Sequence, residues 1–292
     1  RGLGDVYKRQ ASWQPVGKDL NEYKSECHHG TAYTKMLADY SGIHSEVCYY
    51  VPLNQTYEVW HLKVTNASAC ERNLTITGYA EFTNNNNYEQ DQVNLQYSQF
   101  ITSTVFETNR IRHIIHGNLD WVKEGEEVDN KLAISRFFAL TGAPVDSYCG
   151  DKESFLGRYH GYHNPVGVEN GKLSGEMCYN ENGCGALAAQ MLLKPGETKE
   201  IAFLVGMKEH EEAEAICNRY ADVAAQCEME LKELTGYWHE KLEHFQVHTP
   251  SREFDTMINT WNAYNCFMTF IWSRAASFFY CGLRNGYGYR DT

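Results

Sequence analysis

The periodicity of apolar residues changes once along this chain, at about Lys208, and this change limits the folds open to it. From about residue 30 to 206, apolar and polar residues alternate in short segments separated by Gly and Asn turns, which indicates β-strands. After Lys208 apolar residues recur every three or four positions, which indicates helices. We therefore predict an α+β multidomain chain, with an antiparallel β-sandwich over 11–207, a helical linker over 208–248 and the beginning of a helical domain over 249–292.

The predicted sandwich contains strands with one buried and one exposed face. In the segment 57–66, Trp60, Leu62 and Val64 are expected to be buried, whereas Glu58, His61 and Lys63 are expected to face water. The alternation repeats over 74–82, after a turn at 66–73. The segments 187–193 and 201–205 flank Pro195-Gly196, and we predict that they form a hairpin around this turn.

The helical part is predicted from one long apolar stripe. The stripe runs from Ile216 to Leu242 in steps of three or four residues, which predicts one helix of about 35 residues or a broken pair of helices. Thr249-Pro250-Ser251 is a stop followed by a helix cap. We expect a second helix from about Glu253 towards Phe270.

Charge and hydropathy limit the partners of the chain. A formal net charge of −12 argues against a surface for nucleic acids or anionic membranes, and it is compatible with a neutral polyhydroxylated substrate. Apolar runs fall short of the roughly 18 residues of a membrane-spanning helix. The ten cysteines are scattered, which indicates reduced, mostly buried thiols in a cytoplasmic protein. A bridge between Cys178 and Cys184 across a turn is a less favoured alternative.

The two ends of the sequence indicate an added segment at the N-terminus and a fragment end at the C-terminus. The first ten residues lack an initiator Met and an apolar signal core, and they resemble a translated cloning adaptor, so 1–10 are set aside. The chain stops at Thr292 without a helix cap or polar tail, as expected of a fragment.

The last nineteen residues carry the candidate site. Arg274, Arg284 and Asp291 combine forked donors with an acceptor, a pairing suited to a ligand covered in hydroxyl groups. Tyr287 and Tyr289 add flat faces on which sugar rings could pack. From spacing alone, a helix-terminal arginine and a surface turn are the favoured interpretation, and the sugar site is the alternative.

Two other motifs have simpler interpretations. The run Glu26-Cys27-His28-His29-Gly30 could suggest a metal site, but a second ligand pair is absent downstream and a structural loop is favoured. The Asn-rich run 83–88 suits a solvated loop, or alternatively a loop that contacts sugar. The sequence lacks the GxSxG, P-loop, dinucleotide-binding and HExxH motifs, so we expect no cofactor.

Several blocks, taken together, resemble the glycoside hydrolase family 94 phosphorylases, which include the cellobiose and N,N′-diacetylchitobiose phosphorylases. The blocks follow the order found in the family and are Ser12-Trp13-Gln14-Pro15-Val16, Glu26-Cys27-His28-His29-Gly30-Thr31-Ala32-Tyr33-Thr34, Phe155-Leu156-Gly157-Arg158-Tyr159, Asn262-Ala263-Tyr264-Asn265-Cys266, Trp272-Ser273-Arg274 and Gly286-Tyr287-Gly288-Tyr289-Arg290-Asp291. One departure is His28, where the family often has Arg.

The resemblance implies a supersandwich, a helical linker and a truncated (α/α)6 barrel, in a cytoplasmic homodimer. It also implies that Arg274, Arg284 and Asp291 hold the non-reducing sugar in the −1 subsite. A sandwich loop around Asn86 and Asn94 would reach the site of the neighbouring subunit, although Tyr97 stands where an Arg would be expected.

The implied chemistry is inverting phosphorolysis, a hexosyl transfer with inorganic phosphate as co-substrate. Phosphate would attack the anomeric carbon of a β-linked disaccharide while one carboxylic acid protonates the departing oxygen. The resemblance places the general acid beyond Thr292, so the 292-residue chain is expected to be inactive alone. Cellobiose, N,N′-diacetylchitobiose and cellobionic acid are the candidate substrates. A hydrolase of similar architecture and a sugar-binding sandwich module remain alternatives.

Overall fold

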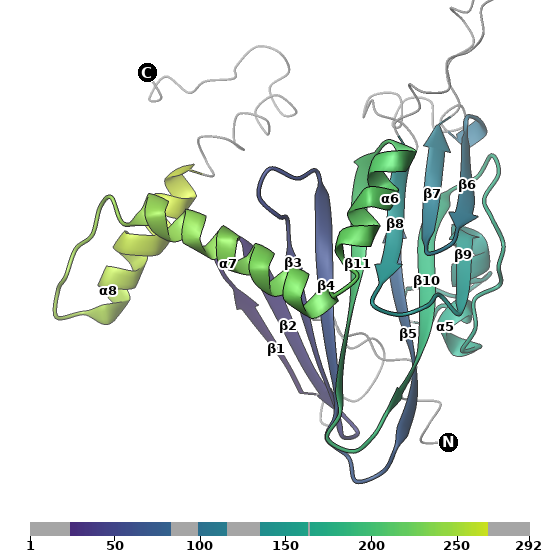
Figure 1. The fold of residues 1–292 in the computed structure, drawn as a ribbon, viewed down its shortest axis with the longest axis horizontal. Helices are drawn as coiled ribbons and strands as arrows, with labels where there is room; N and C mark the ends of the chain where they lie inside the picture. The colour runs from purple at the N-terminus through teal and green to yellow at the C-terminus, as the bar shows by residue number, and fades with distance from the viewer. Residues whose placement is uncertain (1–23, 83–98, 116–134, 163, 268–292) are drawn as a thin grey trace, which may run out of the picture. The chain divides into compact units, whose positions relative to one another are not determined.

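The computed structural model describes residues 24–82, 99–115, 135–162 and 164–267 (Figure 1). The chain divides into two compact units. The first ends at Leu231, and the second comprises Lys232 onwards together with Gly30–Ala32.

The first unit contains two antiparallel sheets, as the alternation predicted. Among the described residues, the larger sheet has eight strands in the order β1-β2-β3-β4-β11-β8-β7-β6. Their bounds are β1 Lys24–His29, β2 Tyr33–Tyr40, β3 Ile43–Tyr50, β4 Tyr57–Asn66, β11 Thr198–Lys208, β8 Ser135–Thr141, β7 Arg110–Ile115 and β6 Thr102–Glu107. The smaller sheet has the order β5-β10-β9, formed by β5 Arg72–Glu81, β10 Gly183–Leu193 and β9 Ser147–Asp151.

The main core lies between the two sheets. Leu74 of β5 and Leu187 of β10 pack in one cluster with Phe138 of β8 and Phe203 of β11. Gly78 of β5 faces the Phe203 ring so closely that an added Cβ would collide with it. The absence of a side chain at Gly78 therefore lets the smaller sheet approach the aromatic layer of the larger one.

Strand β4 is buried on both faces, so the prediction of an exposed face is wrong for His61. On the sandwich side, the Trp60 ring packs edge-on against Phe138, with ring centroids 5.4 Å apart. On the other face, Tyr57 and Val59 are buried and His61 is only 3% exposed. The ring of Tyr220, from the helical segment, packs edge-on against Tyr57 at 6.4 Å. The helices after Lys208 cover this face, which the alternation of one strand could not predict.

His61 is buried beside a carboxylate that partly compensates for its desolvation. Its Nε2 lies 2.7 Å from Oε2 of Glu200 on the neighbouring strand β11. Burial lowers the pKa of His61, although Glu200 opposes the shift.

The predicted hairpin over 187–205 is also wrong, although its turn is present. The Glu197 N–H donates to the Lys194 carbonyl oxygen at 3.0 Å, and Gly196 between them has φ 76°, as a Pro-Gly turn requires. However, β10 pairs with β5 and β9, whereas β11 pairs with β4 and β8. The turn therefore carries the chain from one sheet to the other.

A second crossing, from β4 to β5, lies against this turn at Asn66. The Asn66 N–H donates to the Glu197 carbonyl oxygen at 3.0 Å, and the Asn66 carbonyl accepts from the Gly196 N–H at 2.7 Å. The Asn66 side chain is fully buried and donates to the carbonyl oxygens of Cys70 and Leu193, at 2.8 and 3.0 Å. Asn66 thus joins the two crossings between the sheets.

The long apolar stripe forms a broken pair of helices, one of the two predicted forms. Helix α6 runs over His210–Arg219 and helix α7 over Val223–Leu242. Asp222 begins the second helix, because its carboxylate accepts a hydrogen bond from the Ala225 N–H at 3.1 Å. Two short helices, α4 Lys152–Leu156 and α5 Val166–Glu169, follow β9. Among the described helices, none has the length and hydropathy that a membrane crossing requires.

The run Glu26–His29 lies in strand β1 and is not the loop that the sequence suggested. Within the strand, His28 Nε2 lies 3.1 Å from Glu26 Oε2, and Cys27 Sγ lies 3.4 Å from His29 Nε2. The two histidines thus pair with residues on alternate sides of the strand. Across the described residues, no group of three His, Cys, Asp or Glu side chains is arranged to hold a metal ion.

The cysteines of the described residues carry free thiols, and most of them are buried, as predicted. Cys178 and Cys184 are both among them, so the alternative of a bridge across the turn is not realised.

A buried histidine in β7 makes the stability of the sandwich depend on pH. His113 is 0% exposed, its ring stacks on Phe82 at 5.0 Å, and neither ring nitrogen has a hydrogen-bond partner among the described residues. Burial, with a smaller contribution from the Arg136 cation, lowers the pKa of His113 to about 3. The unfolded chain has a histidine pKa of about 6.5 and binds a proton below that pH, whereas the native state does not.

Stability should therefore fall as the pH drops from about 6.5 towards 3, and we expect His113 to account for a loss of about 2 kcal/mol between pH 7 and pH 5. His113→Leu should remove this part of the slope, measured as urea unfolding at both pH values. Val105→Ala, at an exposed position of the neighbouring strand β6, changes no titratable group and should leave the slope unchanged. An equal slope in His113→Leu and the parent chain would contradict the assignment.

Candidate functional site

The residues predicted to bind sugar lie outside the described residues. This applies to Arg274, Arg284 and Asp291 of the C-terminal segment, and to Asn86 and Asn94 of the sandwich loop. The structure therefore tests none of these five assignments, and they remain predictions.

The second unit contains the helical segment that precedes the predicted site in the sequence. Helix α8, Arg252–Thr256, begins at Ser251, whose hydroxyl accepts a hydrogen bond from the Phe254 N–H at 3.3 Å, so the predicted cap is confirmed. The chain continues as a π-helix, η4, over Met257–Asn262, and stays helical to Phe267.

Aromatic packing and one asparagine hold this helical segment. The Trp238 ring of α7 is buried and contacts Tyr264 and Phe267, with centroid distances of 4.9 and 5.4 Å. Asn259, within the π-helix, donates to the Val247 carbonyl oxygen and accepts from the Val247 N–H, both at 2.8 Å. π-Helical turns are rare in proteins, and many of those known lie at functional sites.

A polar cavity lies in the first unit, between the β6–β7 turn and helix α6. Its volume is about 470 Å³. Helix α6 packs on strands β8 and β11 (Figure 1). Its residues His210, Glu214, Cys217 and Asn218 form one wall of the cavity. The lining residues come from two segments a hundred positions apart and are Glu107, Thr108, Asn109, Arg110, His210, Glu214, Cys217 and Asn218.

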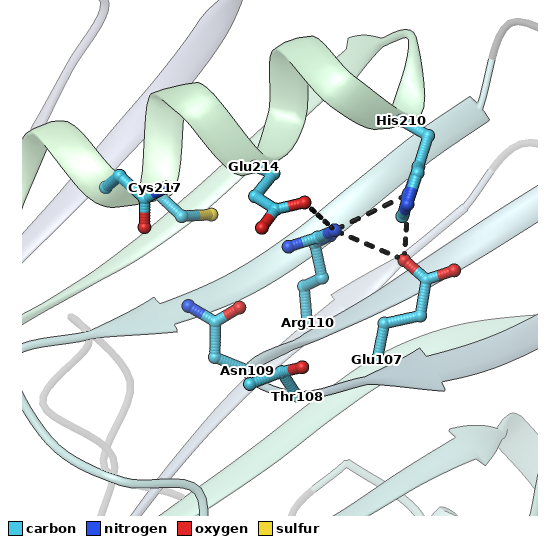
Figure 2. Close-up of a pocket in the computed structure, with 8 residues that line it drawn as sticks. Glu107, Thr108, Asn109, Arg110, His210, Glu214 and Cys217 are labelled. Atoms are coloured by element: carbon cyan, nitrogen blue, oxygen red, sulfur yellow. Dashed lines mark hydrogen bonds and ion pairs between the residues drawn. The ribbon is translucent and has the colours of Figure 1, made fainter.

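Arg110 is the centre of the cavity wall. Its side chain is 5% exposed, and its Nη2 lies 3.4 Å from Glu107 Oε2 and 3.8 Å from Glu214 Oε2. Figure 2 shows the guanidinium group between Glu107 of the strand and the side chains of Glu214 and His210 from the helix. Burying an arginine is unfavourable without carboxylate partners, so these pairs hold the cation in place.

Further contacts orient Glu107. Both Nε and Nη2 of Arg112 donate to Glu107 Oε1, at 2.9 and 2.7 Å. His210 Nδ1 lies 3.0 Å from Glu107 Oε2 and 3.4 Å from Arg110 Nη2. In the hydrogen bond with Arg110, the guanidinium donates and His210 Nδ1 accepts, because arginine has no acceptor atom.

The turn that forms the floor of the cavity is anchored to the next strand. Asn109 accepts a hydrogen bond from the Leu140 N–H at 2.9 Å, and its side chain donates to the Leu140 carbonyl oxygen at 3.2 Å. Thr108 has φ 51°, a left-handed conformation that is strained for a β-branched residue. The position of the turn is therefore set by β8 and not by local preference.

The arrangement suits hydrogen-bonded binding better than covalent chemistry. Cys217 is buried, and burial raises the pKa of its thiol, although Arg110 and Asn109 oppose the shift. The thiol therefore stays protonated and is a poor nucleophile. Sequence reasoning missed this cavity, because no motif links Glu107–Arg110 with His210–Asn218 and only the packing of α6 on the sheet unites them.

The fold defines the class of protein: an antiparallel supersandwich followed by helices that begin a second domain. Comparison with protein families identifies that class further. The family described as Glycosyl hydrolase 94, supersandwich domain, matches residues 9–223, and the Glycosyl hydrolase 94 superfamily, catalytic domain, matches residues 237–292. The chain belongs to glycosyl hydrolase family 94.

Curated relatives agree with this assignment. The chain is 34% identical to an N,N′-diacetylchitobiose phosphorylase of Vibrio furnissii over 99% of its length and 34% of the relative. It is 35% identical to an N,N′-diacetylchitobiose phosphorylase of Vibrio proteolyticus over 96% of its length and 33% of the relative. A cellobionic acid phosphorylase of Neurospora crassa is 26% identical over 75% of the chain and 26% of the relative. The chain therefore spans about a third of the length of the first two relatives.

Proposed function

We propose that the chain is part of an inverting disaccharide phosphorylase, a hexosyltransferase that cleaves a β-linked disaccharide with inorganic phosphate. The observation that carries the proposal is the order of the two family matches, sandwich and then catalytic domain, in a chain at least 34% identical to two such phosphorylases. Among cellobiose, N,N′-diacetylchitobiose and cellobionic acid, these two relatives favour N,N′-diacetylchitobiose.

We propose for the whole protein the organisation implied by the resemblance. Residues 11–207 would form the supersandwich, 208–248 the linker and 249–292 the start of an (α/α)6 barrel, in a cytoplasmic homodimer. Asn86 and Asn94 would approach the site of the neighbouring subunit. The reaction would need phosphate as co-substrate and no other cofactor.

The stereochemistry of the proposed reaction and the number of carboxyl groups it needs follow from phosphate acting as the nucleophile. A phosphate oxygen attacks the anomeric carbon from the face opposite the departing sugar, so a β-linkage gives an α-sugar 1-phosphate. A single carboxylic acid protonates the departing glycosidic oxygen, and no second carboxylate is needed to activate water. Arg284 and Arg274 would donate hydrogen bonds to sugar hydroxyls, and Asp291 would accept from one.

Replacing Arg284 by alanine in the full-length enzyme should remove a hydrogen bond between a charged donor and the sugar. We expect kcat/KM for phosphorolysis to fall about 30-fold, which corresponds to about 2 kcal/mol. Arg290→Ala, at a neighbouring arginine to which no sugar contact is assigned, is the matched control and should change kcat/KM less. Unchanged kinetics in Arg284→Ala would remove this residue from the site.

One assay of the full-length protein separates the proposed reaction from hydrolysis. Release of sugar 1-phosphate is measured with each of the three disaccharides, with and without inorganic phosphate. We expect cleavage only with phosphate, and best with N,N′-diacetylchitobiose. Cleavage to free sugars without phosphate would instead identify a hydrolase. The 292-residue chain alone should release no sugar 1-phosphate, and detectable release would place the general acid within it.

A further inference from the structure

A cysteine and a histidine lie side by side on an exposed strand at the edge of the larger sheet. Within the described part of the chain, β1 is the first strand of that sheet and pairs only with β2 (Figure 1). Alternate residues of a strand share one face, and Cys27 Sγ lies 3.4 Å from Nε2 of His29, two residues further on. Both residues are exposed. The thiol therefore has a proton acceptor within reach and is open to molecules from solution.

A third side chain orients the imidazole ring of His29. Thr34 of β2 pairs with His29 across the two strands, and its hydroxyl oxygen lies 3.0 Å from His29 Nδ1. A neutral imidazole has one donor and one acceptor nitrogen. When Nδ1 carries the proton and donates to Thr34, Nε2 is the acceptor that faces the Cys27 thiol. A nucleophile, a base and an orienting group within hydrogen-bond reach of one another form the arrangement by which proteins activate nucleophiles.

Other cysteines of the described residues provide the comparison. Cys70 is also exposed, but its Sγ lies 3.7 Å from the Ser68 hydroxyl, a group that does not act as a base at neutral pH. The buried thiols are those of Cys48, Cys149, Cys178, Cys184, Cys217 and Cys227. Thiol reactions need both access and removal of the proton, because the thiolate is the nucleophile. We therefore expect Cys27 to react faster than Cys70 and the buried thiols.

We propose that Cys27 is a reactive thiol, activated by His29, and that small disulfide molecules in solution modify it. Cys27 Sγ attacks one sulfur of the disulfide while its proton passes to His29 Nε2. A bond forms between the two sulfurs, the S–S bond of the reagent breaks, and the departing thiolate takes up the proton from His29. The products are a mixed disulfide at Cys27 and one molecule of free thiol. This inference goes beyond the proposed function and does not depend on it.

The test measures how fast each cysteine of the 292-residue chain reacts. Hydroxyethyl disulfide, which is uncharged, is added at neutral pH, the reaction is stopped with acid at intervals, and the modified peptides are identified by mass spectrometry. We expect Cys27 to react about tenfold faster than Cys70, because a positioned base takes up the thiol proton. Cys149, which is buried, should stay unmodified and thereby report that the chain is folded.

Variants of the base and of its orienting group test the cause of the reactivity. His29→Gln removes the base and should slow Cys27 about tenfold, to the rate of Cys70. Thr34→Val removes the orienting hydroxyl and should slow Cys27 about threefold, whereas Thr34→Ser keeps the hydroxyl and should react as the parent does. His28→Gln is the matched control, because His28 pairs with Glu26 on the other side of the strand, and the rate should not change.

Two results would overturn the proposal directly. One is a Cys27 that reacts no faster than Cys70 in the parent chain. The other is a His29→Gln variant that is folded, with Cys149 unmodified, and keeps the parent's rate at Cys27. If His29→Gln does not fold, Thr34→Val decides the question, because valine has nearly the shape of threonine, and an unchanged rate in that variant also overturns the proposal.

Discussion

Glu230→Ala should lower the free energy of unfolding of the first unit by about 4 kcal/mol, because it removes the acceptor of a buried hydrogen-bond network. Glu230, on α7, is 6% exposed. Its carboxyl group accepts hydrogen bonds from the Tyr50 and Tyr220 hydroxyls at 2.8 Å and from Gln226 Nε2 at 2.9 Å. The Tyr57 hydroxyl oxygen lies 3.3 Å from the Tyr220 hydroxyl oxygen.

The alanine variant would remove the carboxylate acceptor of both tyrosine hydroxyls, and Tyr220 would keep only the longer contact of 3.3 Å with the Tyr57 hydroxyl. Burial raises the pKa of both Tyr50 and Tyr220, so both remain protonated donors at neutral pH. These contacts join α7 to strands β3 and β4, so their loss should loosen the helix from the sheet. In a unit of this size, the loss corresponds to a fall in Tm of roughly 8–16 °C.

The measurement is urea unfolding followed by circular dichroism, with thermal unfolding beside it. Glu228→Ala, at an exposed position of the same helix, is the matched control and should change stability by less than about 0.5 kcal/mol. Glu230→Gln keeps one acceptor oxygen and should fall between the two. A loss below about 1 kcal/mol in Glu230→Ala would show that the network contributes little.

Asn66→Ala should have the second largest effect, about 3 kcal/mol, because the side chain of this fully buried residue makes four hydrogen bonds. Its amide group donates to the Cys70 and Leu193 carbonyl oxygens, and its Oδ1 accepts from the N–H and the hydroxyl of Ser68. Alanine would leave these groups unpaired at the point where the chain crosses twice between the sheets. Urea unfolding measures the loss.

Two further variants define the cause of this loss. Asn66→Asp keeps the acceptor but cannot donate to Leu193 and Cys70, and it buries a charge, so it should be destabilising as well. Glu71→Ala, at an exposed position directly before β5, is the control and should change stability by about 0.5 kcal/mol or less. If Asn66→Ala and Glu71→Ala unfolded at the same urea concentration, the crossings would not depend on the Asn66 side chain.

The candidate sites differ in how far the sequence predicts them. The C-terminal site was predicted from the sequence, because its residues lie close together in the chain and near blocks that resemble the family. These residues are Arg274, Arg284 and Asp291. The cavity around Arg110 has no such signal, because His210 and Glu214 reach it from a helix a hundred residues away. The residues of α6 lie near Glu107 and Arg110 only because the helix packs on the sheet. No regular spacing in the sequence indicates this contact.

Local preferences, which the sequence carries directly, determined the kinds of element in this protein and their order. Alternation predicted the antiparallel strands, the period after Lys208 predicted the helices, and Ser251 was recognised as a cap because capping involves only the next three residues. The blocks shared with the family determined its membership in the same way, position by position.

Only the tertiary structure decided how these elements combine. Alternation shows that a strand has a buried face, but it does not show which strand lies beside it, so the Pro195-Gly196 turn was taken for a hairpin although it joins two sheets. His61 was expected in water because the helices that cover its face come some 150 residues later in the chain. Burial of this kind depends on contacts between distant segments, and these are settled by the free energy of the whole fold.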